Sequence, residues 1–333
     1  MTSKRRREKA AFVSSPEVLA HLPEVSGNAI NGFGESDVSR PKPVMWHDPE
    51  ILPHGELQKW FRVQRKPPAS VEYRRQSIAY TRETPPDIAP QRPGWSATEW
   101  TARVKEAALS RGADLVGIAR MNRDWVFEGF EADYRWIVVL VVAMDYDNLA
   151  GAPDDASDAE VMRQYCRGTG AAYKLAGWMR EHGWDAKPHG GPEAGPVLMI
   201  PPAIEAGLGE LGKHGSMINR EFGASFRLAC VMTDIPLIAD RPDLFGADEF
   251  CTGCRLCTDA CPVDAIHTEK QLVRGETKWY VDFDQCIRYF VEHQGCALCL
   301  PICPWSRPGV APRLAEKMTR RIARGGETLD PAG

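Results

Sequence analysis

The chain has 333 residues, of which 43% are hydrophobic and 26% charged, a composition typical of a globular protein with one large or two ordinary domains. Its net charge of −4 and pI of about 6.1 exclude an overall basic field, so we expect no nucleic-acid partner. No stretch approaches 18 apolar residues, and the basic run at residues 4–9 lacks the apolar segment that follows in an export signal. These features predict a cytoplasmic protein without a membrane partner.

Residues 1–95 combine frequent prolines with scattered aromatic residues such as Trp46 and Trp60. The prolines interrupt the segment too often for long helices. The aromatic residues argue against simple disorder, because disordered chains contain few of them. We therefore predict an irregular N-terminal segment that covers the core.

Regular structure begins at Ser96, where Ser96 and Glu99 form a capping box that predicts a helix ending near Gly112. Hydrophobic patterning predicts strands over 115–119, 136–143, 197–200 and 226–233, with a helix over 160–182 and a short helix from Pro201. Strand 136–143 is apolar on both faces, which favours a central position in the sheet. The alternation of strands and helices predicts an α/β (α+β) domain over residues 96–240.

Eight of the ten cysteines lie in a domain that we place at residues 241–310, ahead of a charged C-terminal tail at 311–333. Residues 251–262 form a C-x2-C-x2-C-x3-C-P run, which is the spacing of bacterial ferredoxins, where three cysteines bind one [4Fe–4S] cube and the fourth binds the other. A zinc ribbon is the alternative, but it normally offers paired CxxC motifs without a third cysteine in register. We assign Cys251, Cys254, Cys257 and Cys303 to one cluster, and Cys261, Cys286, Cys296 and Cys299 to the other.

The segment from Gly207 to Gly212 matches G-x-G-x-x-G, the pattern of a dinucleotide-binding turn. That interpretation requires a strand before the first glycine, whereas residues 201–206 are predicted to be helical. The functional alternative is a loop whose small residues let the backbone approach a bulky ligand, together with Lys213 and His214. A plain turn with solvated charges remains the third possibility.

Iron–sulfur clusters pass single electrons, so a group that reacts with a substrate requires a further cofactor, which the spacing does not name. A simple electron carrier does not need some 240 residues ahead of its clusters, although that function stays open. Tyr165 and Tyr173 share one face of the predicted helix, and composition alone favours packing residues at both positions.

The chain resembles the cobalamin-dependent reductive dehalogenases over about residues 96–310. The resemblance rests on the strand ending at Tyr146, on Tyr165, on the segment 175–188, on the loop 200–215, on Arg227 with 233–237, and on both cysteine runs. It implies a nitroreductase-like core that binds base-off cobalamin, joined to a ferredoxin-like domain with two [4Fe–4S] clusters. It also implies an organohalide substrate, in which hydrogen replaces halogen, and reduced ferredoxin or flavodoxin as an external electron donor, as in soluble, non-respiratory members.

In that family a tyrosine donates a proton beside a basic residue, and the resemblance places Tyr165 and Lys213 in these roles. It also implies that the glycine loop approaches the corrin, which makes Gly207, Gly209, Gly212, His214 and Gly215 candidate cofactor contacts. One departure concerns a Gly-Asn pair of the family, for which this chain has Gly190 and Gly191.

The nearest rival is epoxyqueuosine reductase, a cobalamin enzyme with the same arrangement of eight cysteines. The residues from Tyr165 to Gly168 resemble its Tyr-Ala-Arg-Gly segment. That family continues with an aspartate that acts as the acid, whereas this chain continues with Thr169, Gly170 and two alanines. The absence of this acid favours a dehalogenase, since a general acid contributes about 10²–10⁴-fold to a rate.

Overall fold

The computed structural model describes residues 11–326. The basic run at 4–9 and the last seven residues of the predicted tail lie outside the described residues. Within residues 11–326, no helix combines the length and the apolar character needed to cross a bilayer.

The core is an antiparallel sheet whose strands, within the described residues, have the order β1-β2-β6-β3. The strands are β1 (Leu115–Arg120), β2 (Trp136–Ala143), β3 (Ala186–Gly190) and β6 (Phe226–Thr233). β2 is central and buried on both faces, as predicted. The strand predicted at 197–200 is wrong: Val197 forms only an isolated bridge with Val126, and the edge of the sheet is formed by β3.

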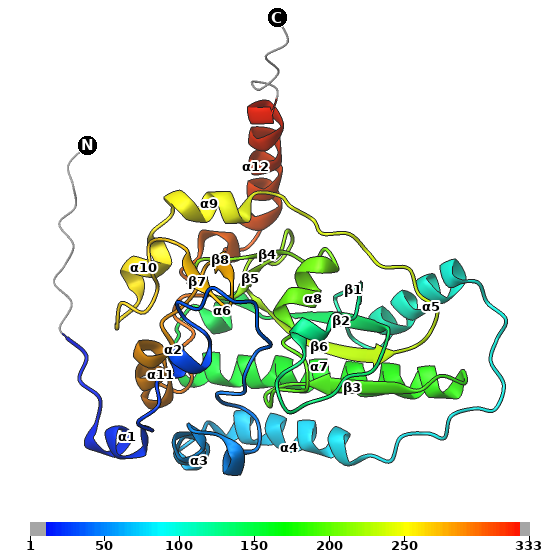
Figure 1. The fold of residues 1–333 in the computed structure, drawn as a ribbon, viewed down its shortest axis with the longest axis horizontal. Helices are drawn as coiled ribbons and strands as arrows, with labels where there is room; N and C mark the ends of the chain where they lie inside the picture. Colours follow the sequence, from blue (N-terminus) through cyan, green and yellow to red (C-terminus); the bar gives the residue numbers. More distant parts are fainter. Residues whose placement is uncertain (1–10, 327–333) are drawn as a thin grey trace, which may run out of the picture.

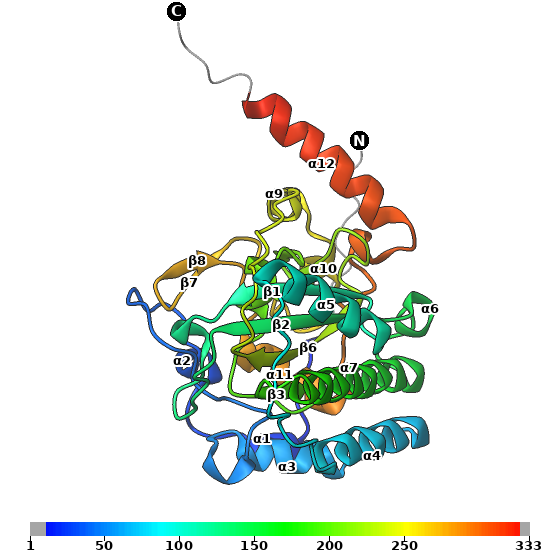
Figure 2. The ribbon, with the colours of Figure 1, turned by 90° about the vertical axis from the view of Figure 1, so that its right-hand side faces the viewer.

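Helices cover both faces of this sheet (Figures 1 and 2). Val138 and Leu140 of β2 pack with α5 (Ala97–Ser110) and α7 (Asp155–Glu181), while the alternate residues Val139 and Val141 pack with α8 (Ile200–Glu205). α5 begins with the predicted capping box, and Pro201 and Pro202 lie in the first turn of α8, as expected. Two short helical segments, η2 (Arg123–Trp125) and α6 (Tyr146–Leu149), flank β2.

The N-terminal segment is more helical than the sequence predicted. It contains α1 (Pro16–His21), α2 (Gly27–Ile30), η1 (Pro49–Ile51), α3 (Gly55–Val63) and α4 (Pro68–Arg82). α4 is 15 residues long, because Pro67 and Pro68 lie at its N-cap and first turn, where proline needs no amide hydrogen. It lies along the outer side of α7, and the buried Ser77 hydroxyl contacts Thr169 of α7 (Figure 2).

The cysteine-rich part consists of short elements packed against one end of the core. They are the hairpins β4 (Glu210–Leu211) with β5 (Met217–Ile218) and β7 (Gln271–Val273) with β8 (Glu276–Lys278), and the helices α9 (Ala247–Gly253), α10 (Leu256–Ala260), α11 (Phe283–Glu292), η3 (Pro304–Ser306) and α12 (Val310–Gly326). The predicted charged tail is thus largely helical. α12 buries Ala315 and Met318 in a cluster with Phe245 and Trp305, and its far end projects from the molecule (Figure 1).

The N-terminal segment forms hydrogen bonds both with the cysteine-rich part and with residues beside the core sheet. Asp284 of α11 accepts hydrogen bonds from the amide of Gly27 at 2.7 Å and from the Ser26 hydroxyl at the start of α2. Arg40 donates to the carbonyl oxygen of Val126, beside the core sheet, at 2.8 Å. Residues distant in sequence therefore fix the cysteine-rich part against the sheet.

Candidate active site

Four cysteines surround a small closed cavity between α9, α10 and η3. They are Cys251, Cys254, Cys257 and Cys303, and Lys213, His214 and Trp305 complete the wall. Burial, together with the charges of the neighbouring cysteines, raises the pKa of the Cys251 and Cys303 thiols to about 12. Cys251 and Cys303 are thus stable as thiolates here only beside a cation, which is what an iron–sulfur cluster provides.

The remaining four cysteines influence one another at a second position. Burial, together with the charges of Cys296 and Cys261, raises the pKa of Cys286 to about 12. Burial raises the pKa of Cys299 as well, and the charges of Cys286, Cys296 and Cys261 contribute, as does that of Cys257 from the first group. The structure thus divides the eight cysteines into two groups, and each long run contributes one cysteine to the group centred on the other run.

The loop that carries Cys296 has an unusual backbone. Residues 294–297 all have positive φ, from 48° at Cys296 to 85° at Gly295. Left-handed conformations at non-glycine residues cost about 1–3 kcal/mol each and persist where function requires them. This conformation turns Cys296 and Ala297 toward a second, larger cavity.

That larger cavity has a volume of about 330 Å³ and lies between the N-terminal segment, α7 and the Cys296 loop. Its wall includes Tyr165 and Cys296, so a candidate proton donor and a candidate cluster ligand share one cavity. The expected covering segment also contributes to the wall, through Trp46, Phe61, Arg62, Lys66, Ser70, Val71 and Arg74. Sequence reasoning missed these residues because they belong to no motif and lie far from Tyr165 in the sequence.

Arg227 is the basic residue that the structure places against Tyr165. Its guanidinium carbon lies 5.3 Å from the centre of the Tyr165 ring, and its Nε is buried without a hydrogen-bond partner among the described residues. On β6, Arg227 alternates in phase with Ala229 and Val231, which face α7. The sequence does contain a signal for Arg227: it is a charged residue at a position where the apolar strand 226–233 faces the core.

Lys213 occupies a different place from the one expected. It does not line the cavity of Tyr165; its Nζ donates to the carbonyl oxygen of Cys254 at 2.8 Å and lies 4.8 Å from the centre of the Trp279 ring. It is 1% exposed and borders the first cysteine group. The expected pairing of Lys213 with Tyr165 is therefore replaced by the contact between Arg227 and Tyr165.

The glycines of the loop 207–215 pack closely against other residues of the protein. A Cβ atom at Gly207 would lie 2.5 Å from the carbonyl oxygen of Arg241, one at Gly209 2.3 Å from that of Ile218, and one at Gly215 2.9 Å from Val281. At Gly212 it would lie 2.7 Å from the His214 ring, which borders the first cysteine group. These contacts explain the glycines without a corrin. The dinucleotide alternative fails because α8, and not a strand, precedes Gly207.

Of Gly190 and Gly191, the departure from the family pattern, Gly190 lies against Thr169 and Gly191 lies behind Tyr165. A Cβ atom at Gly191 would lie 2.1 Å from Cδ1 of Tyr165, so the ring occupies space that only glycine leaves free. The carbonyl oxygen of Gly191 accepts a hydrogen bond from Thr169 at 3.0 Å, which fixes the turn. Gly191 thus stands where the family pattern has an asparagine, and the Tyr165 ring occupies the space next to it.

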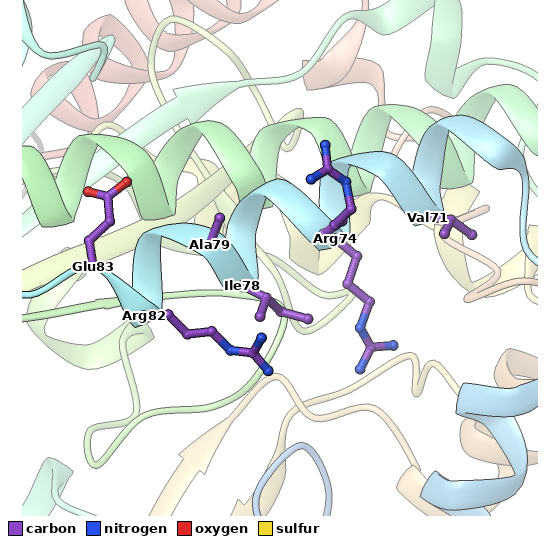
Figure 3. A pocket seen from close by; sticks show the side chains of 7 residues that line it. Val71, Arg74, Ile78, Ala79, Arg82 and Glu83 are labelled. Carbon is purple, nitrogen blue, oxygen red and sulfur yellow. The ribbon is translucent and has the colours of Figure 1, made fainter.

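A third hollow, of about 640 Å³, runs along α4 and is lined by Val71, Ile78 and Arg82 (Figure 3); Val71 also borders the Tyr165 cavity. It is formed by one helix and includes none of the predicted site residues. The chemistry-bearing residues gather around the cavity of Tyr165 and the two cysteine groups.

Comparisons with known proteins agree with this arrangement. Residues 250–306 match the family profile of 4Fe-4S dicluster domains, which supports two clusters over the zinc alternative. A tetrachloroethene reductive dehalogenase of Dehalobacter restrictus is 34% identical over 210 residues, 59% of this chain and 37% of that protein. An epoxyqueuosine reductase of Leadbetterella byssophila is 34% identical over 131 residues, covering 34% of this chain and 39% of that one.

A solved catabolic reductive dehalogenase, in complex with 3-bromo-4-hydroxybenzoic acid, superposes with a TM-score of 0.72 at 25% identity. The match covers 92% of this chain and 48% of that one, so the chain spans about half of that protein or less. The predicted mixed α/β fold is confirmed, and the predicted similarity to reductive dehalogenases is borne out by these relatives. The chain is a relative of the reductive dehalogenases and, more distantly, of the epoxyqueuosine reductases.

Proposed function

We propose that this protein is a reductive dehalogenase that uses cobalamin and two [4Fe–4S] clusters to replace a carbon–halogen bond by a carbon–hydrogen bond. The observation that carries the proposal is the cavity that joins Tyr165 and Arg227 to Cys296. It offers a proton donor, a cation and a cluster ligand around one volume of small-molecule size.

The residues around this cavity fit a cofactor with a polar periphery. Nε of Arg62, Nε of Arg227 and Oε1 of Gln294 are buried and have no hydrogen-bond partner among the described residues. Such atoms favour a ligand that carries amide groups, as the corrin of cobalamin does. When bound, cobalamin supplies the electrons that break the carbon–halogen bond, and the clusters supply electrons to it.

The reaction consumes two electrons and one proton and releases a halide, and the proton must come from an acid. Tyr165 lines the cavity, and its hydroxyl serves as the acid that donates this proton. The guanidinium of Arg227, 5.3 Å from the ring, stabilises the phenolate that remains and any negative charge on the substrate.

The proposal includes the partners implied by the resemblance: an organohalide substrate, an external ferredoxin or flavodoxin as donor, and a cytoplasmic location. It also retains the two ligand sets, with Cys251, Cys254, Cys257 and Cys303 on one cluster and Cys261, Cys286, Cys296 and Cys299 on the other. Their separation into two groups supports these sets.

Reduction of a different substrate, as in the epoxyqueuosine reductases, is the second candidate. The similarity to such an enzyme favours it. The residues after Gly168 oppose it, because Thr169, Gly170, Ala171 and Ala172 are buried and offer no acid. Turnover of epoxyqueuosine in tRNA without any halide release would establish this second function.

The test is the variant Tyr165→Phe, which removes only the hydroxyl. We expect halide release to fall by at least about two orders of magnitude, the lower range for one general acid, with iron and corrinoid content unchanged. Arg227→Met should also lose activity at full cofactor content. Tyr173→Phe is the matched control, because Tyr173 lies on the same helix but does not line the cavity, and it should keep the parent rate. Parent activity in Tyr165→Phe would show that another group supplies the proton.

A further inference from the structure

His214 borders the first cysteine group and has a buried ring nitrogen without a partner among the described residues. The ring is 5% exposed and borders the cavity formed by Cys251, Cys254, Cys257 and Cys303. The amide of Ser216 donates to its Nδ1 at 3.2 Å. A ring nitrogen that accepts a hydrogen bond carries no proton, so the proton of the neutral ring lies on Nε2. This Nε2 is buried and has no partner among residues 11–326.

Gly212 leaves the space that this ring needs. A Cβ atom at position 212 would lie 2.7 Å from Cε1 and 3.0 Å from Nε2 of His214. The placement of the His214 ring therefore explains why residue 212 is a glycine.

Lys213 places a buried positive charge at the same cavity. Its side chain is 1% exposed, its Nζ donates to the Cys254 carbonyl at 2.8 Å, and its amide donates to Sγ of Cys251 at 3.5 Å. No carboxylate within residues 11–326 forms an ion pair with it. A buried charge without a counter-charge is costly, and a cube with four thiolate ligands carries net negative charge that offsets it.

We propose that Lys213 and His214 form a donor pair that raises the reduction potential of the cluster bound by Cys251, Cys254, Cys257 and Cys303. Reduction adds one electron, and hence one negative charge, to this cluster. The ammonium of Lys213 and a hydrogen bond from Nε2 of His214 to a cluster sulfur both stabilise the added charge. The proposal goes beyond the dehalogenation and requires only that the cluster is present.

The test is a redox titration of the reconstituted full chain with dithionite, followed by electron paramagnetic resonance. In Lys213→Met and in His214→Phe, we expect the ratio of reduced to oxidised first cluster at a fixed potential to fall about tenfold, which is ~59 mV for a one-electron couple. The second cluster in the same molecule is the internal reference, and its potential should not change. Unchanged potentials of the first cluster in both variants would overturn the proposal.

Lys270→Met is the matched control. Lys270 lies 5.6 Å from the centre of the same Trp279 ring, but its side chain is 33% exposed and pairs with Asp248 at 2.7 Å. Its loss should leave both potentials at the parent values. Lys213→Arg keeps the charge and should keep the potential of the first cluster; a tenfold fall in this variant would contradict a role for charge.

A second measurement does not depend on the Lys213 variants. With ¹⁵N-labelled histidine, the reduced first cluster should show a hyperfine coupling to nitrogen in pulsed spectra, and His214→Phe should remove it. A parent spectrum without this coupling would show that Nε2 does not donate to the cluster, even if a substitution at Lys213 prevented cluster assembly.

Discussion

At the scale of single residues, the placement of the Tyr165 ring depends on a glycine that is remote in sequence. Gly191 lies where a Cβ atom would come within 2.1 Å of the Tyr165 ring, and Arg227 holds the ring from the other strand. The position of the hydroxyl is thus decided by contacts of the ring rather than by the helix that carries it.

We predict that Gly191→Ala displaces the Tyr165 ring. Overpacking of this kind costs about 1–3 kcal/mol, and a misplacement of the donor by about 1 Å lowers the rate by about 10²-fold. Thermal unfolding and halide release measure the two effects. Gly177→Ala is the control on α7, where the added Cβ meets Pro86 at an ordinary 3.5 Å; it should keep the rate and raise stability by about 0.5–1 kcal/mol. Equal activities of the two variants would contradict this role of Gly191.

At the scale of elements, the glycine loop anchors the helix that carries Cys251. Glu210 of β4 is 6% exposed, and its Oε1 accepts hydrogen bonds from the amides of Phe245, Gly246 and Ala247 at 2.7–3.0 Å. α9 has no side-chain cap of its own, because Gly246 occupies its N-cap. The carboxylate of Glu210 supplies the cap from another element.

Glu210→Ala should therefore destabilise the chain by about 2–4 kcal/mol, since it leaves several buried amides without an acceptor. Incorporation of the first cluster should fall with it, while the second cluster assembles normally. Denaturant unfolding and iron content measure these effects. Glu205→Ala, at an exposed position of α8, should change stability by less than about 0.5 kcal/mol. A first cluster that assembles fully in Glu210→Ala would exclude the anchoring role.

At the scale of the whole molecule, the sheet and the cysteine-rich part have separate hydrophobic cores. Val138, Leu140 and Leu175 belong to the first, whereas Cys251, Cys303 and Trp305 belong to the second. Thiolate ligands are thus part of the second core, and the sheet core contains none of them.

Removal of iron by a chelator should accordingly destabilise the cysteine-rich part before the core sheet. We predict that amides of α9, α10 and α11 lose protection from hydrogen exchange, because cluster binding and folding are coupled there. Amides of β2 and β6 should stay protected, since their core contains no cluster ligand. Simultaneous loss of protection in β2 would show that the two parts unfold as one unit.

The sequence by itself determined the elements whose signals are local. The spacing of the cysteines predicted the dicluster domain, the capping box at Ser96 predicted α5, and the apolar runs at 136–143 and 226–233 predicted the two central strands. Each signal depends on neighbours within a few residues, and so it can be recognised without the fold.

Only the tertiary structure decided which residues meet. Lys213 and Arg227 are both basic and both follow Tyr165, and pairing in the sheet turns Arg227 toward α7 while the loop buries Lys213 beside the cysteines. The residues of α3 and α4 that line the cavity carry no motif, because their role arises from packing against α7. Contacts between distant segments depend on register and packing, which no local pattern records.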